Sequence, residues 1–160
     1  MIDDRLATEL ILKAEALLEG EAPLPERLQQ LMQLLKDHQP HYHWVGIYWL
    51  KGNELILGPY VGPPTEHVCI PVGRGVCGTA VAENVNQIVY DVRERSNYLA
   101  CNLETRSEIV VLIREPNTGK ILGQIDVDGT EVGAFDESDE AFLEVIADRI
   151  ARCVSQRSVI

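Results

Sequence analysis

Two pairs of short apolar runs, each pair joined by a turn, constrain the fold of this chain more than any other feature. Residues 43–62 read HWVGIYWLKGNELILGPYVG, with two apolar and aromatic runs around a polar KGNE turn. Residues 107–129 read SEIVVLIREPNTGKILGQIDVDG, with two further runs around an NTG turn. Such patterns are typical of β-hairpins. Together with shorter strands expected at residues 67–70 and 87–92, they predict a mainly antiparallel sheet.

Helical periodicity flanks this pattern at both ends of the chain. Residues 3–19 and 24–40 carry apolar side chains at intervals of three or four, and residues 135–156 repeat that spacing. Helices that precede and follow a run of hairpins predict an α+β fold with the sheet flanked by helices. At 160 residues the chain suits one domain. Its expected parts are N-terminal helices in 1–39, the sheet and site loops in 40–135, and a C-terminal helix in 136–158.

The charge and the apolar pattern exclude several classes of partner. The formal net charge of −11 opposes binding to nucleic acid, because that binding depends on basic groups that neutralise phosphates. The N-terminal residues MIDDRLATEL are acidic where a secretory signal is basic, and no apolar run approaches the roughly 20 residues that span a bilayer. We therefore expect a cytoplasmic protein without a membrane partner. In that reducing compartment the cysteines are expected as thiols rather than structural disulfides: Cys69, Cys77, Cys101 and Cys153.

Two of these cysteines lie in local sequences that favour a reactive thiol. Cys77 follows the glycines of IPVGRGVCGTA and is expected near the start of a short helix, where unpaired N–H groups stabilise a thiolate. The alternative is a small apolar side chain that packs the helix on the sheet. Cys101 lies in the polar stretch NYLACNLETRS between arginines, which favours reactivity, although a loop cysteine can also be buried under its loop.

Three acids interrupt otherwise apolar strand sequence. Asp126 and Asp128 project to one face of their strand, and Glu108 belongs to the partner strand of the same hairpin. Partly buried carboxylates raise one another's pKa, so such a group can hold a proton or bind a cation; alternatively this face is simply solvated. Trp44 and Tyr48 also share a face and could wall an ammonium group, or pack in the core. No His/Cys set has the close paired spacing of a structural zinc site, so no bound metal is expected.

Taken together, these motifs resemble a known family. WVGIY at Trp44, LGPYVG, IPVGRGVCGTAV, Cys101, RSEIVV, LGQIDVD and FDESDE occur in order over roughly residues 40–150. They are similar to the free methionine-(R)-sulfoxide reductase branch of the GAF-domain family. The resemblance implies a GAF fold, a homodimer, no bound cofactor, and reduction of free methionine sulfoxide through cysteine sulfenic acid and disulfide intermediates, with thioredoxin as the reductant.

The resemblance also implies roles for residues, and one departure from the family pattern. Cys101 would be the attacking thiol, while Glu108, Asp126 and Asp128 would bind the substrate and supply a proton, with Trp44 and Tyr48 around its methylthio end. The family usually carries a resolving cysteine where this chain has His67. Cys69 and Cys77 are the alternative resolving thiols. The competing hypothesis is a non-catalytic GAF module that binds a small ligand or senses oxidants through its thiols.

Overall fold

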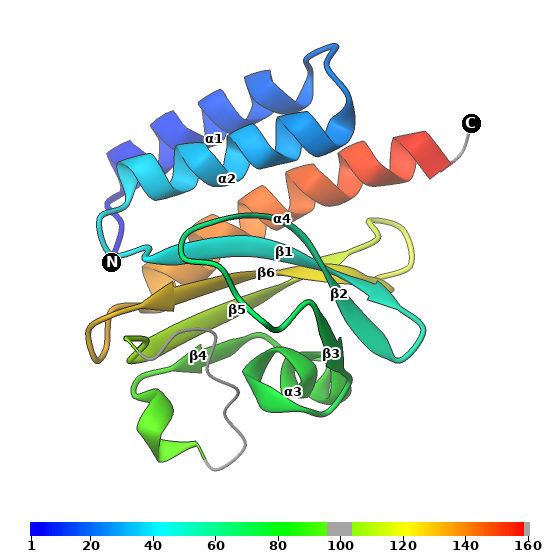
Figure 1. Ribbon diagram of the computed structural model, residues 1–160. Helices are drawn as coiled ribbons and strands as arrows, with labels where there is room; N and C mark the ends of the chain where they lie inside the picture. Colours follow the sequence, from blue (N-terminus) through cyan, green and yellow to red (C-terminus); the bar gives the residue numbers. More distant parts are fainter. Residues whose placement is uncertain (96–103, 159–160) are drawn as a thin grey trace.

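The chain folds as a central sheet with its long helices on one side. The computed structural model describes residues 1–95 and 104–158. Helices α1 (Asp4–Leu18), α2 (Leu24–His38) and α4 (Glu137–Ser158) lie on one face of the sheet, and α3 (Gly75–Glu83) lies on the opposite face (Figure 1). None of the helices in these two ranges is both long enough and apolar enough to cross a membrane.

The sheet confirms the predicted antiparallel arrangement. Its strands in the described ranges are β1 (Trp44–Lys51), β2 (Glu54–Val61), β3 (Cys69–Pro71), β4 (Gln87–Val89), β5 (Ser107–Arg114) and β6 (Ile121–Gly129). Within the described ranges it has six strands in the order β3-β2-β1-β6-β5-β4, and every neighbouring pair is antiparallel. The two predicted hairpins are β1–β2 and β5–β6. The strand predicted at residues 87–92 is shorter, because the Asp91 carboxylate accepts a hydrogen bond from the Arg93 N–H and opens a 3₁₀ turn at Val92–Glu94.

Acidic caps start two of the three long helices. The Asp3 carboxylate accepts a hydrogen bond of 2.8 Å from the Leu6 N–H at the start of α1. At the start of α4 the Asp136 carboxylate accepts from the Ser138 N–H at 2.9 Å, and the Asp139 carboxylate accepts from the Asp136 N–H at 3.1 Å. This reciprocal pairing satisfies N–H groups that have no partner inside the helix.

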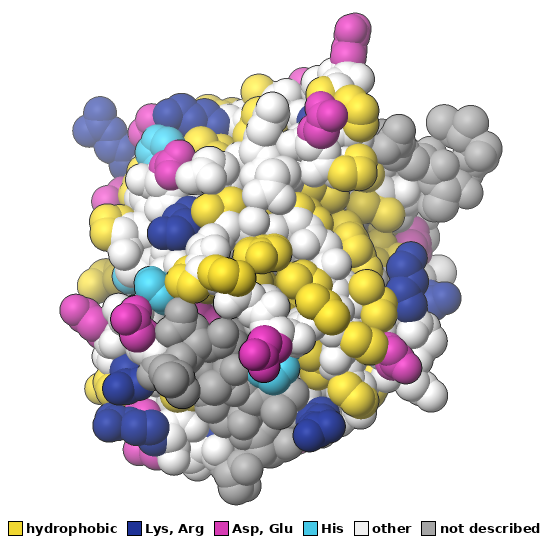
Figure 2. All heavy atoms as spheres, in the orientation of Figure 1, with side chains coloured by type: hydrophobic (Ala, Val, Ile, Leu, Met, Phe, Trp, Pro, Cys, Tyr) yellow, Lys and Arg dark blue, Asp and Glu magenta, His cyan; other side chains and the backbone are white. Residues whose placement is uncertain are grey.

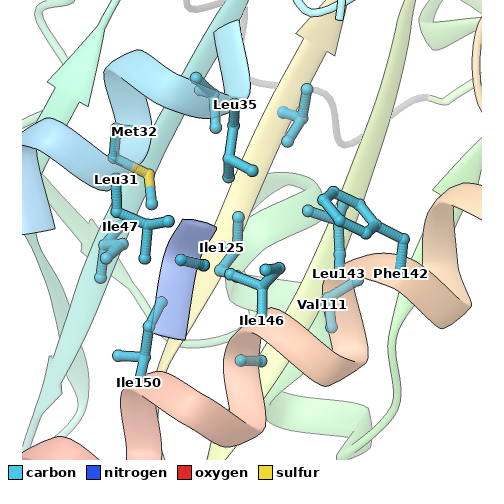
Figure 3. Packing of buried hydrophobic residues seen from close by; sticks show 14 of the residues in the cluster. Leu31, Met32, Leu35, Ile47, Val111, Ile125, Phe142, Leu143, Ile146 and Ile150 are labelled. Atoms are coloured by element: carbon cyan, nitrogen blue, oxygen red, sulfur yellow. The ribbon is translucent and has the colours of Figure 1, made fainter. Parts of the chain in front are cut away.

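Apolar side chains fill both faces of the sheet. On the helical face, residues of α2 and α4 pack against every second residue of the central strands (Figure 3). The opposite face carries a smaller apolar cluster beneath α3. Side chains alternate along a strand, so residues flanking those of the main core point toward α3. The labelled side chains in Figure 3 are Leu31, Met32, Leu35, Ile47, Val111, Ile125, Phe142, Leu143, Ile146 and Ile150.

Candidate functional site

The sheet register brings the predicted acids and aromatics together on the face toward α3. Trp44 of β1 pairs with Asp128 of β6, and Asp128 pairs in turn with Glu108 of β5. In the next row on the same face, Gly46 of β1 pairs with Asp126 of β6. Directly paired residues point to the same face, so three strands present these side chains side by side. Glu108, Asp126 and Asp128 are all buried, which excludes the hypothesis of a solvated face.

Aromatic rings form one wall of this face. The rings of Trp44 and Tyr60 stack with centroids 5.3 Å apart, and the ring centroid of Tyr48 lies 6.2 Å from that of Trp44. Gly46 makes this stack possible, since a Cβ atom there would lie 2.6 Å from the Trp44 ring and 2.6 Å from the Tyr60 Cβ. Sequence reasoning did not assign Tyr60. The signal available was its position across the hairpin from Gly46.

The glycines of residues 73–78 bring Cys77 down onto the carboxylates. Gly73 and Gly75 have φ angles of +92° and +66°, which form the tight turn before α3. Gly78 allows close packing, because a Cβ atom there would lie 2.5 Å from the Pro71 carbonyl oxygen. Cys77 is the third residue of α3 and is only 4% exposed. Its thiol donates to Glu108 Oε2 over 3.8 Å.

Cys77, Glu108 and Asp126 form a compact buried cluster. One donor atom from each side chain lies within 4.8 Å of the others, and no other group in the described ranges was found with such a metal-compatible arrangement. Burial raises the pKa of Asp126 above that of an ordinary carboxyl group, and the neighbouring Glu108 and Cys77 side chains offset part of that rise. Among the described residues neither carboxylate oxygen of Asp126 has a hydrogen-bond partner. The cluster can therefore hold a proton or receive a cationic group.

Of the other two predicted catalytic cysteines, Cys101 lies outside the described residues, and Cys69 does not join this cluster. Cys69 is exposed on edge strand β3, where its thiol donates to Glu54 Oε2 at 2.5 Å, and this hydrogen bond raises the pKa of the Cys69 thiol. Its neighbour Ile70 points into the cluster beneath α3, so the Cys69 side chain points to the opposite face.

The segment between β2 and β3 is connected to the floor of the site. The Tyr48 hydroxyl donates a hydrogen bond of 2.8 Å to the His67 carbonyl oxygen. Tyr48 is fully buried and His67 is half-buried. The residue in the usual resolving-cysteine position is therefore held next to the aromatic wall through its backbone.

Comparisons with known proteins agree with this architecture. The GAF domain family model matches residues 23–154. The free methionine-R-sulfoxide reductase of Escherichia coli K12 is 36% identical over 140 residues, covering 88% of this chain and 83% of that protein. A structure of the free methionine-R-sulfoxide reductase from Neisseria meningitidis in complex with its substrate has a TM-score of 0.89 at 30% identity, covering 100% of this chain and 96% of that one.

A further solved structure is similar over almost the whole chain. The fRMsr of Staphylococcus aureus in complex with substrate is 40% identical with a TM-score of 0.84, covering 96% of this chain and 99% of that one. The family match, the identity over most of the chain and the shared fold agree with one another. The chain belongs to the GAF domain family, in its free methionine-R-sulfoxide reductase branch, as its sequence motifs predicted.

Proposed function

We propose that this protein reduces the free amino acid L-methionine-(R)-sulfoxide to L-methionine. The relatives that carry this activity in their names cover most of the chain, and two related structures hold their substrate. The observation that carries the proposal is the buried face where Trp44, Asp128 and Glu108 form one cross-strand row beside Asp126. Buried carboxylates are normally stabilised by hydrogen bonds, by a proton or by a cationic group. A ligand with an ammonium group can supply such a cationic group.

The carboxylates account for selection of the free amino acid. Free methionine sulfoxide has an α-ammonium group, whereas the α-nitrogen of a methionine within a chain is a neutral amide. In our proposal Glu108 and Asp128 bind the ammonium group, because a cationic group within hydrogen-bond distance favours the charged form of a buried carboxyl group. The stacked rings of Trp44, Tyr48 and Tyr60 contact the methylthio end through sulfur–aromatic packing.

The chemistry needs a thiol and a proton. A cysteine thiolate takes the sulfoxide oxygen and becomes a sulfenic acid, while methionine leaves as the reduced thioether. The oxygen leaves the sulfur as it gains a proton, and the raised pKa of Asp126 suits this residue to donate it. A second thiol attacks the sulfenic acid, forming a disulfide and releasing water, and two electrons and two protons from thioredoxin restore both thiols.

We assign the attacking thiol to Cys101 and the resolving thiol to Cys77 rather than Cys69. Cys77 lies against Glu108 within the site, while Cys69 is on the opposite face and its pKa is raised, which disfavours a nucleophilic thiolate. The homodimer, thioredoxin as reductant and the cytoplasmic location stay predictions from the sequence.

Thioredoxin-coupled turnover tests the proposal. Wild type is expected to reduce free L-methionine-(R)-sulfoxide and to act at least about 100-fold more slowly on the N-acetyl derivative, which lacks the ammonium group. Cys101→Ser and Cys77→Ser are expected to abolish turnover, and Cys69→Ser is the matched control that retains it. A folded, fully reduced wild type without turnover would contradict the proposal and favour the non-catalytic GAF module.

A further inference from the structure

The cluster of Cys77, Glu108 and Asp126 has the composition of a metal site as well as of a substrate site. Its donors are one sulfur and two carboxylate oxygens, supplied by α3, β5 and β6. These residues are far apart in sequence, so the close-spacing criterion for zinc ligands cannot detect them. The three donor atoms lie within 4.8 Å of one another.

The spacing of the donors suits a small tetrahedral ion. Zinc binds sulfur at about 2.3 Å and carboxylate oxygen at about 2.0 Å, which places two such donors about 3.5 Å apart in a tetrahedral site. Cys77 Sγ and Glu108 Oε2 are 3.8 Å apart. Closing this pair around an ion therefore requires the separation of the two atoms to shorten by only about 0.3 Å. Three protein donors leave a fourth position for water.

Asp126 supplies an independent indication of a cationic ligand. Its side chain is 0% exposed, and both carboxylate oxygens lack a hydrogen-bond partner among the described residues. Buried carboxylates are normally hydrogen-bonded, paired with a cation or bound to a metal. One of its oxygens is the atom that faces the Cys77 thiol and Glu108.

We propose that Cys77, Glu108 and Asp126 bind a thiophilic divalent cation, with Zn²⁺ as the ion that fits best, and that the bound ion excludes the amino-acid substrate. The sulfur donor disfavours Mg²⁺ and Ca²⁺, which take oxygen ligands. Binding replaces the Cys77 thiol proton, and the proton of Asp126 where it is present, with the metal, and both protons pass to solvent.

The exclusion of substrate rests on the proposed function, whereas the metal binding does not. A bound ion occupies Glu108, one of the two carboxylates that we assign to the ammonium group, and Asp126, the assigned proton donor. Metal coordination also blocks Cys77 as a resolving thiol, because its sulfur lone pair is bound. The cation would act as a reversible inhibitor that competes with the sulfoxide.

Cobalt spectroscopy tests the metal site without any turnover. Chelator-treated, fully reduced protein is titrated with Co²⁺ under anaerobic conditions, and we expect a saturable thiolate-to-cobalt charge-transfer band that Zn²⁺ displaces. Cys77→Ser removes the band, and Glu108→Gln and Asp126→Asn weaken Co²⁺ binding at least tenfold while keeping the thiol. Cys69→Ser is the matched control, because Cys69 also contacts a carboxylate, that of Glu54, but lacks a third donor in the described structure.

Two outcomes overturn the metal site: absence of the band in wild type, and a band that persists in Cys77→Ser.

A second experiment tests whether the bound ion excludes the substrate. Free methionine sulfoxide is added to the cobalt complex of Cys101→Ser, which keeps the three ligands, and the band is expected to decline as the substrate concentration rises. An unchanged band at saturating substrate contradicts the exclusion. If wild type shows the band but no turnover, the metal site stands and the proposed function fails. If wild type turns over substrate but shows no band, the proposed function stands and the metal site fails.

Discussion

Asp126 and Asp139 are both completely buried carboxylic acids, yet their surroundings are opposite. Asp139 lies in the first turn of α4, where its oxygens contact His41 Nε2 at 2.9 Å and the Met1 amino group at 2.8 Å. Burial acts to raise the pKa of Asp139, but hydrogen bonds from His41, the amino group and the Asp136 N–H outweigh it, so the pKa lies below its usual range. Asp126 has no such partners among the described residues, and its pKa is raised.

The difference distinguishes an acid that stabilises the fold from one that we propose to serve the site. Asp139 fixes the start of α4 against the segment that leads into β1, and its charge is fully compensated within the fold. Asp126 lowers the stability of the protein at neutral pH, because burial disfavours its charged form more than the neighbouring Glu108 and Cys77 side chains stabilise it. Uncompensated groups of this kind are concentrated at functional sites. The comparison therefore indicates the α3 face, and not the start of α4, as the site that receives a ligand.

The largest expected effect is on stability, in Asp139→Asn. Removing this carboxylate takes away the group that accepts hydrogen bonds from His41 Nε2, the Met1 amino group and the Asp136 N–H, and we expect the free energy of unfolding to fall by about 3 kcal/mol. Urea unfolding at pH 7 measures it. Asp148→Asn on the same helix is the control, because its ion pairs with Arg149 and Arg152 are partly solvated and each contributes about 0.5 kcal/mol or less. Equal losses in the two variants would contradict the assignment of Asp139 as a structural acid.

Asp126→Asn is expected to lower activity and to raise stability, the reverse of the stability loss expected in Asp139→Asn. The amide is similar in shape but carries no charge and cannot donate the carboxylic proton, so kcat/KM for free methionine sulfoxide should fall about 100-fold. The free energy of unfolding at pH 7 should rise, because the cost of burying a carboxylate is removed. Turnover and urea unfolding on one preparation check both. Retained activity would show that Asp126 is not the proton donor, and a loss of stability would show that its charge is compensated.

The two acids are expected to contribute to the free energy of unfolding with opposite signs, and both contributions are lost as pH falls. The folded pKa of Asp126 is raised, so folded protein holds this proton at pH values where unfolded protein has lost it, and the gain in Asp126→Asn disappears as pH falls below the usual carboxyl pKa of about 3.9. The folded pKa of Asp139 is lowered, so its contribution is complete above about 3.9 and is lost as pH falls through the folded value. Urea unfolding of both variants and wild type from neutral to acid pH measures these differences. Parallel curves for the two variants would contradict the comparison.

The fold could be predicted from sequence because its signals are local. The KGNE and NTG turns and the apolar spacing of the helices each act over a few residues, and they correctly gave two hairpins and the flanking helices. The shared face of Asp126 and Asp128 followed from strand alternation alone. The similarity of motifs then predicted the family that the comparisons confirm.

The site was less accessible because its contacts join distant segments. The local sequence identifies Asp126 as an acid within an apolar strand, but it does not reveal that Asp139 is buried and hydrogen-bonded, since the partners of Asp139 are Met1 and His41, far away in the sequence. The contact of Cys77 with Glu108 depends on how closely α3 packs, which Gly78 permits. The role predicted for Cys101 falls outside the described residues and stays a prediction.

The smallest effect is expected from removing one hydroxyl group, that of Tyr48 at the site, with removal of the Tyr42 hydroxyl beside Asp139 as the comparison. Tyr48→Phe keeps the ring stacked on Trp44 but removes the hydrogen bond to the His67 carbonyl, which should lower the free energy of unfolding by about 1 kcal/mol. Because that bond holds the segment between β2 and β3 beside the site, KM for free methionine sulfoxide should also rise several-fold. Tyr42→Phe is the control, since its hydroxyl donates to Asp139 over 3.4 Å, and we expect it to change stability but not KM. If KM is unchanged in Tyr48→Phe as well, the hydroxyl contributes to the fold alone and the ring is the part of Tyr48 that serves the site.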